Sequence, residues 1–334
     1  MSPAYKEKVV TMKIATLTMN PAIDKSSAVN QVVAEWKLRC EPPTYEPGGG
    51  GLNVSRAIRK LGGDSLALYA AGGFSGQVLS DLLDREGLNH QAMAIAGLTR
   101  ENFTVLEKST GQQYRFGMPG PTITEAEWQR CLEELSGLLP QVDYLVASGR
   151  LPPGVPPDFY AQLARLAREH NTRLIVDTSG EALRLAVEEG VFLIKPNLRE
   201  FAELMGRESV EGLEEERLAQ ELVATGQSET VVVSLGAAGV LAASAEGAER
   251  VRAPLVPIKS KVGAGDSTVA GIVLALARGQ SWREAVRFGV AAGAAAVMTP
   301  GTELCRREDV ERLYEQLRLT GDYLRNTTLS GNRR

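Results

Sequence analysis

Short apolar runs alternate with amphipathic stretches along the first 250 residues. The apolar runs lie at 13–18, 66–71, 143–147, 173–177, 192–194 and 230–234. Between them, apolar residues recur at helical spacing, as in 53–61 and 76–86. Continuous apolar strands separated by helices are typical of a mainly parallel sheet covered on both faces. The pattern therefore predicts an α/β fold.

Two stretches depart from this alternation. Residues 26–45 and 90–117 alternate polar and apolar positions, with a turn signal at 109–111. This pattern favours short antiparallel strands outside the main sheet, forming a small β-lid over the ends of the parallel strands. The chain after residue 266 is helical in pattern over 267–278, 282–297 and 307–317.

The chain contains neither a long linker nor an internal repeat. We therefore predict one domain over residues 13–317, with a flexible tail at 1–12 and a polar C-terminal tail at 318–334. The N-terminus has no signal-peptide pattern, and no run of about 18 apolar residues is present, so we expect a cytoplasmic protein without a membrane partner.

Composition excludes several classes of chemistry. With 37 Lys and Arg against 41 Asp and Glu, the net charge is −4, and there is no basic excess to bind nucleic acid. The three cysteines are far apart and have no neighbouring histidine, so they form neither a disulfide framework nor a zinc site. His90 and His170 are interpreted as solvated or capping residues. Any proton transfer is therefore expected to involve a carboxylate.

A glycine run precedes the first predicted helix. Gly48, Gly49, Gly50 and Gly51 lead into Asn53, and consecutive glycines are costly unless the backbone comes close to something or adopts positive φ. The amides of such a helix start can bind anions or hydroxyls. The alternative is a flexible loop.

A second glycine motif precedes the apolar helix near residue 267. Gly263, Ala264 and Gly265 leave bare amides at the helix N-terminus, which would stabilise charge on a transferring phosphoryl group. Asp266 beside them could accept a proton from an attacking hydroxyl. The alternative is that Asp266 is only the N-cap, which does not explain the two glycines before it.

Two further sets of polar residues follow strand ends or lie in the lid. Asn197 and Glu200 are three residues apart and suit Mg²⁺ held mainly by nucleotide phosphates, although the spacing alone favours a capping box. Each of the other residues is by itself a surface residue, but together they could clamp a phosphorylated sugar: Asp24, Lys37, Arg100, Arg115 and Arg150.

The two glycine motifs resemble the signatures of the ribokinase/PfkB sugar-kinase family. The similarity is closest to its bacterial minor (PfkB-type) 6-phosphofructokinase branch and covers about residues 13–317. Further segments that carry it are 37–40, 113–116, 118–120, 151–155, 176–183, 231–236 and 287–293.

The resemblance implies a doubly wound sheet, a lid that also forms a homodimer interface, and glycolytic transfer of the γ-phosphate of MgATP to the 1-hydroxyl of fructose 6-phosphate. It gives Asp266 the role of base, Gly263, Ala264 and Gly265 that of anion hole, and Asn197 and Glu200 that of Mg²⁺ ligands. For ATP it implies contacts with Lys195, Asn197, Ser234, Gly236, Gly239, Val290 and Ala294. For the sugar phosphate it implies contacts with Asp24, Lys37, Gly49, Gly50, Asn53 and Arg100.

Departures from the family pattern keep some assignments open. Ser148-Gly149-Arg150 stands where relatives usually have Ser-Gly-Ser, and our hypothesis is that Arg150 binds the sugar phosphate; the alternative is that it points to solvent. Lys261 stands where Thr is common and Glu303 where a close relative has Arg, and these changes leave open any K⁺ site built from carbonyls near Val262 and Gly301. Tagatose-6-phosphate kinase and 1-phosphofructokinase activity remain alternatives, as does a non-catalytic sugar-phosphate or nucleotide sensor, against which the intact Asp266 argues.

Overall fold

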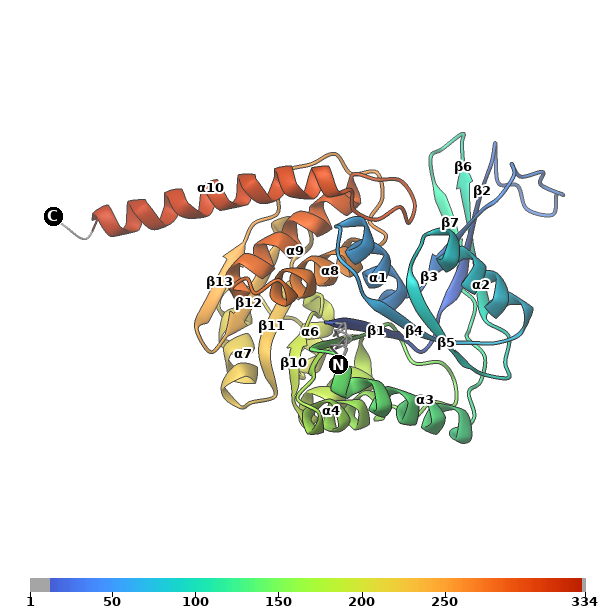
Figure 1. Cartoon of the computed structure of the whole chain (residues 1–334). Coiled ribbons are helices and arrows are strands. Elements are labelled where there is room, and N and C mark those ends of the chain that lie inside the picture. Colours follow the sequence, from blue (N-terminus) through green and yellow to red (C-terminus); the bar gives the residue numbers. More distant parts are fainter. Residues whose placement is uncertain (1–12, 332–334) are drawn as a thin grey trace, which may run out of the picture.

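The computed structural model describes residues 13–331, with side chains up to residue 319. The predicted tail at residues 1–12 lies outside the described residues. The described chain forms a nine-stranded sheet with helices on both faces, and a four-stranded sheet stands apart from it at one end (Figure 1). The predicted fold class, a large mainly parallel sheet with a small lid, is confirmed.

The main sheet reverses its winding direction at β1. Its strand order is β13-β12-β11-β10-β9-β8-β1-β4-β5; neighbouring strands from β5 to β11 run parallel, and β12 and β13 are antiparallel. The strands are β1 Ile14–Thr18, β4 Leu66–Ala71, β5 Asn89–Ala94, β8 Tyr144–Ser148, β9 Arg173–Asp177, β10 Val191–Ile194, β11 Ser228–Ser234, β12 Val240–Ser244 and β13 Gly247–Val251. Open α/β sheets bind ligands beyond the carboxyl ends of their strands, near such a reversal.

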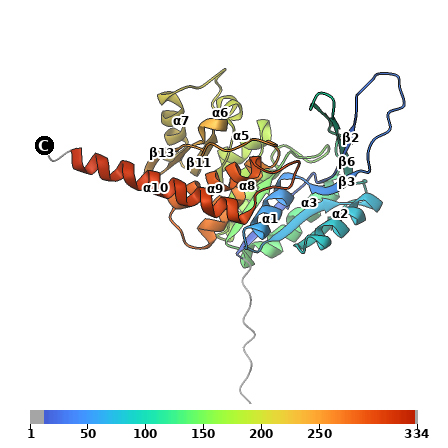
Figure 2. The same ribbon diagram turned by 90° about the horizontal axis from the view of Figure 1, so that it is seen from above.

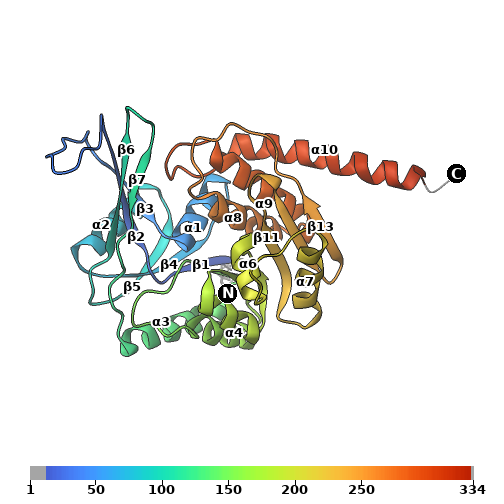
Figure 3. The same ribbon diagram turned by 180° about the vertical axis from the view of Figure 1, so that it is seen from behind.

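Helices cover both faces of this sheet (Figure 3). One layer consists of α3 Glu125–Leu138, α4 Phe159–Glu169, α5 Gly180–Glu189, α6 Leu198–Leu204 and α7 Leu213–Ala224, with the short 3₁₀ turn η1 Leu139–Gln141. The other consists of α1 Gly50–Lys60, α2 Gly73–Arg85, α8 Ala264–Ala277, α9 Trp282–Val297 and α10 Arg307–Gly331. No helix within residues 13–331 is both long and apolar enough to cross a membrane.

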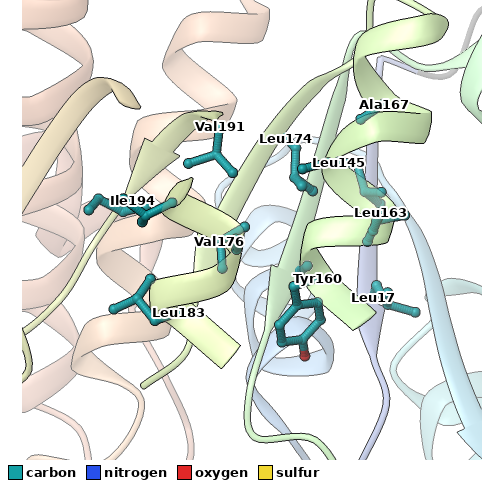
Figure 4. Close-up of a cluster of buried hydrophobic side chains, with 14 of the residues drawn as sticks. Leu17, Leu145, Tyr160, Leu163, Ala167, Leu174, Val176, Leu183, Val191 and Ile194 are labelled. Carbon is teal, nitrogen blue, oxygen red and sulfur yellow. The ribbon is translucent and has the colours of Figure 1, made fainter. Parts of the chain in front are cut away.

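Close packing fixes the strands against the first of these layers. Leu145 and Leu174 project from neighbouring strands toward Leu163 of α4, while Val176 packs near Leu183 of α5 (Figure 4). These side chains are buried, and burying one leucine contributes about 2 kcal/mol. The carboxyl ends of β8, β9 and β10 are therefore held on a rigid support.

The lid consists of β2 Ala22–Val29, β3 Thr44–Gly48, β6 Arg100–Glu107 and β7 Gln113–Phe116, in the order β3-β2-β6-β7. Figure 2 shows it standing beside the main body. Two details differ from the expectation. β2 and β6 are parallel, because a long segment of the main domain rather than a hairpin connects them. The residues at 89–94 form β5 at the edge of the main sheet, where only one face is covered.

Two helix ends also differ from the pattern-based expectation. α1 begins at Gly50, so half of the glycine run lies within the helix. α10 continues to Gly331, past the expected end at residue 317, and extends away from the body (Figure 1). This segment contains no proline, and its interior glycine, Gly321, costs about 1 kcal/mol without preventing helical backbone.

Candidate active site

The carboxyl ends of the parallel strands and the N-termini of two helices meet at one edge of the main sheet. Ser148 ends β8, Asp177 ends β9, and Lys195 directly follows β10. The N-terminal residues of α1 lie against the end of β8, since a Cβ on Gly50 would be 2.2 Å from the Ser148 Oγ. Those of α8 lie beside Lys195, whose Nζ would be 3.2 Å from a Cβ on Gly265. The residues of both glycine motifs are thus brought together.

The N-terminus of α8 is bare, as its sequence predicted. Gly263 is the N-cap residue in the left-handed conformation (φ 74°), and no side chain caps the helix. A Cβ at this position would also lie 2.3 Å from Leu304, so only glycine fits. Asp266 is the third helical residue, and the interpretation of Asp266 as the N-cap is therefore wrong.

Asp266 is a half-buried carboxylate with one close hydrogen-bond donor. The side-chain amide of Asn53 donates to its Oδ2 at 2.9 Å. Burial raises the pKa of Asp266 to about 7, and the negative charge of Asp177 adds to this; Asn53, Lys195 and Arg56 act in the opposite direction. A carboxyl group with this pKa is suited to general base catalysis near neutral pH.

Lys195 supplies a fixed positive charge beside this carboxylate. Its Nζ lies 3.2 Å from the Asp177 Oδ1, and its side chain is buried. Burial alone would lower the pKa of Lys195, but Asp177 and Asp266 together raise it above its ordinary value. Because Gly265 has no side chain, this ammonium group can lie directly beside the α8 N-terminus.

The glycine run is explained by close approach of the backbone. Gly49 has φ 122°, and a Cβ on Gly48 would lie 2.4 Å from the Asp24 carboxylate. On Gly51 it would lie 2.4 Å from the Leu17 carbonyl oxygen. The expectation that the run serves close approach and positive φ is confirmed, and the flexible-loop alternative is wrong.

Arg56 is a site residue that the sequence analysis did not single out. It is 2% exposed, and its Nη1 donates to the side-chain oxygen of Asn53 at 3.2 Å, while Asn53 donates to Asp266. The signal was present in the sequence: Arg56 lies three residues after Asn53 and so shares a face of α1 with it.

Asn197 and Glu200 form the capping box of α6. The Asn197 side chain accepts from the Glu200 amide at 3.0 Å, and the Glu200 Oε2 accepts from the Asn197 amide at 2.9 Å. Asn197 is nevertheless exposed, and within the described residues Glu200 makes no hydrogen bond through its second oxygen. No group of three or more His, Cys, Asp or Glu side chains suited to a metal occurs in the described chain.

The residues assigned to the nucleotide divide into two groups. Ser234 ends β11 and bridges to Asn197, while Gly236 begins the 3₁₀ turn η2 Gly236–Ala238 and Gly239 directly follows it, both with positive φ. Ser234 lies next to Lys195, since its amide donates to the Pro196 carbonyl at 2.9 Å. Val290 and Ala294 are buried in α9, in the apolar layer shared with α8, and their contact with adenine stays a prediction.

Two of the residues assigned to the sugar lie in the lid, Asp24 in β2 and Arg100 in β6. Asp24 accepts from Asn102 at 2.8 Å, and Arg100 donates to the carbonyls of Asn20, Pro21 and Met118. Burial lowers the pKa of Arg100, against the effect of Asp24. Both Asp24 and Arg100 line a hollow of about 970 Å³ between the lid and the segment at 300–303.

Lys37 and Arg150 lie away from these contacts. Lys37 is exposed in the segment between β2 and β3. Arg150 is exposed and lines a separate hollow with Thr178 and Ser179, and it forms no ion pair within the described residues. The roles of both in sugar-phosphate binding stay predictions.

The two histidines were interpreted as solvated or capping residues. His170 is the C-cap of α4. His90 instead belongs to β5, where its ring lies within hydrogen-bonding distance of Tyr69 and Asp84. Neither belongs to the site, so the carboxylates remain its acid–base groups.

The chain is similar to known proteins over nearly its whole described length. The family model "pfkB family carbohydrate kinase" matches residues 15–309. The ATP-dependent 6-phosphofructokinase isozyme 2 of Mycobacterium tuberculosis is 47% identical over 303 residues, which cover 91% of this chain and 89% of that protein. The isozyme of the same name in Escherichia coli is 43% identical over 307 residues, covering 92% and 99%.

Crystal structures of phosphofructokinase-2 from Escherichia coli share the fold, each covering 92% of this chain and 99% of that one. The complex with fructose-6-phosphate has a TM-score of 0.86 at 41% identity, and the complex with potassium has 0.88 at 42%. A tetrameric inhibited form has a TM-score of 0.86 at 41% identity. The resemblance carried by the two glycine motifs is confirmed: the chain belongs to the pfkB family of carbohydrate kinases.

Proposed function

We propose that this protein transfers the γ-phosphoryl group of ATP to the 1-hydroxyl of fructose 6-phosphate, giving fructose 1,6-bisphosphate and ADP. The observation that carries the proposal is Asp266, a carboxyl group with a pKa of about 7 in the first turn of a glycine-started helix beside Lys195. The relatives named for this activity support the choice of substrate.

The arrangement suggests how the transfer is catalysed. Asp266 accepts the proton as the sugar oxygen forms its bond to phosphorus and the bond to the departing ADP oxygen breaks. The amides at Gly263, Ala264 and Gly265 and the ammonium of Lys195 face the negative charge on the moving phosphoryl group. Positioning and charge stabilisation supply most of the rate, because the phosphoryl group needs little covalent help.

ATP binding and a Mg²⁺ ion follow from the same proposal. Asn197 and Glu200 offer an exposed amide and a carboxylate oxygen, which suit an ion bound mainly by nucleotide phosphates. A Mg²⁺ ion bound there would neutralise phosphate charge.

For a K⁺ ion we propose two oxygen ligands: the Gly301 carbonyl, which accepts from Ser260, and the buried Thr302 hydroxyl, which has no partner within the described residues. Oxygen ligands of this kind suit a hard cation.

We further propose that two copies associate through their lids. Tyr45, Lys25, Phe103 and Phe116 form one row across the four lid strands, with Tyr45 45% and Phe116 50% exposed. Exposed aromatic side chains gathered on one face are typical of the centre of an interface.

We also propose a cytoplasmic location, because an enzyme that uses ATP and a sugar phosphate works where both are made.

Replacing Asp266 tests the proposal. In Asp266→Asn, kcat should fall by about 10³, in the range that loss of a general base causes, while ATP binding measured by calorimetry is retained. Asp81→Asn, which changes an exposed carboxylate on α2, is the matched control and should keep wild-type kcat.

Substrate preference is tested on the wild-type protein, whose kcat/KM for fructose 6-phosphate should exceed that for tagatose 6-phosphate and fructose 1-phosphate. Binding without turnover in the wild type would instead identify a sensor.

A further inference from the structure

Arg56 lies at the centre of a buried hydrogen-bond network that reaches the proposed base. Its Nε and Nη2 donate to the two carboxylate oxygens of Glu86, the C-cap residue of α2, at 2.8 and 2.7 Å. Such a two-point contact fixes the plane of the guanidinium. Its Nη1 is thereby directed toward the Pro47 carbonyl at 3.0 Å and the Asn53 side-chain oxygen at 3.2 Å.

This contact decides which way the Asn53 amide points. An asparagine side chain has an acceptor on one side and donors on the other, whereas a guanidinium has donors only. With its oxygen held by Arg56, Asn53 must present its N–H to Asp266, as the 2.9 Å contact has it. A rotated amide would face Asp266 with its oxygen, and that contact requires a protonated carboxyl group.

We propose that Arg56 is a positioning residue of the transfer reaction, which holds the Asn53 amide so that Asp266 stays a hydrogen-bond acceptor. The proposal rests on the proposed role of Asp266 as the base. Arg56 does not touch the reacting atoms and reaches Asp266 through Asn53. Its Nη1 also lies 3.5 Å from the Thr302 carbonyl oxygen and its Nη2 3.7 Å from Glu46, two residues that line the hollow beside the lid. Through Pro47 in β3, the same guanidinium also ties the base of the lid to this network.

The charged groups that face Asp266 determine how its pKa should change when Arg56 is lost. They are Asp177 at the end of β9, Lys195 after β10 and Arg56 on α1, together with the neutral Asn53. Asn53 and Arg56 both lower the pKa of Asp266, and Arg56 also fixes the orientation in which Asn53 does so. Loss of Arg56 removes both effects, so Asp266 should hold its proton to higher pH.

The test is the pH dependence of kcat at saturating MgATP and fructose 6-phosphate. The acid limb of this profile is the pH range in which kcat rises as Asp266 loses its proton. In Arg56→Met, this limb should move to higher pH by about one unit, so that kcat falls about fivefold at pH 7 and much less at pH 9. A merely structural role would lower kcat equally at all pH values. Arg59→Met, an exposed arginine one turn along the same helix, should leave the profile unchanged.

Arg56→Lys separates position from charge and gives a second variant should Arg56→Met fail to fold. Lysine keeps the positive charge but cannot make the two-point contact with Glu86, so its acid limb should also move upward. A wild-type limb in folded Arg56→Lys, or an unmoved limb in folded Arg56→Met, overturns the proposal. Absence of turnover in the wild type overturns the proposed function instead, so the two failures are distinguishable.

Discussion

At the scale of single residues, the behaviour of Asp266 depends on its charged neighbours. Asp177 raises its pKa, whereas Lys195 lowers it. Asp177→Asn should therefore move the acid limb of kcat to lower pH, because it removes the like charge and leaves Lys195 with Asp266 as its carboxylate partner. The measurement is kcat against pH at saturating substrates. Asp143→Asn, an exposed carboxylate just before β8 at the opposite end of the strand, is the control. An unmoved or raised limb would refute this account of the site.

The roles of single residues could be predicted from the sequence where the residue type is unusual for its position. Two glycines before Asp266 pointed to a bare helix end, and the structure has it there. Arg56 was missed because a single arginine on a helix is ordinarily a surface residue. Only the fold reveals that α2 brings Glu86 against it and that Asn53 lies between it and Asp266. Such a network depends on contacts between segments far apart in the sequence.

At the scale of elements, the start of α1 is the most demanding packing feature. A Cβ on Gly51 would lie 2.4 Å from the Leu17 carbonyl oxygen, and backbone cannot move aside cheaply. Gly51→Ala should therefore destabilise the protein by about 1–3 kcal/mol, seen as a lower urea midpoint. Gly137→Ala in α3, where a Cβ meets nothing within 4 Å, should instead be neutral or stabilising by up to about 1 kcal/mol. Equal midpoints for the two variants would contradict this explanation of the glycine run.

Element boundaries were predictable where burial follows the strand or helix period. The residues of β4, β9 and α9 lie as the pattern indicates because their apolar positions face the core. β5 was assigned to the lid because an edge strand, half covered, alternates like a lid strand. The parallel pairing of β2 with β6 is set by the connection through the main domain, which local alternation cannot report.

At the scale of the whole molecule, the proposed site lies between the main domain and the lid. The main domain supplies Asp266 on α8, Lys195 and the helix N-termini, whereas the lid supplies Asp24 and Arg100, which we propose contact the sugar phosphate. The lid is a thin sheet whose aromatic row is partly open to solvent, and a sheet of this kind is more stable with a second layer against it. Association through the lid would thus also fix the sugar-binding side of the site.

Phe116→Asp tests this association. The substitution places a charge in the aromatic row, and a charge buried without a partner at an interface centre weakens binding strongly. Light scattering during size exclusion should show a wild-type mass of at least two chains and a variant mass closer to one. Leu213→Asp makes the same chemical change at an 85% exposed residue at the start of α7, far from the lid, and should keep the wild-type mass (Figure 1). A wild-type monomer, or a Phe116→Asp variant that still assembles, would show that the lid is not the interface. The aromatic row would then require another partner.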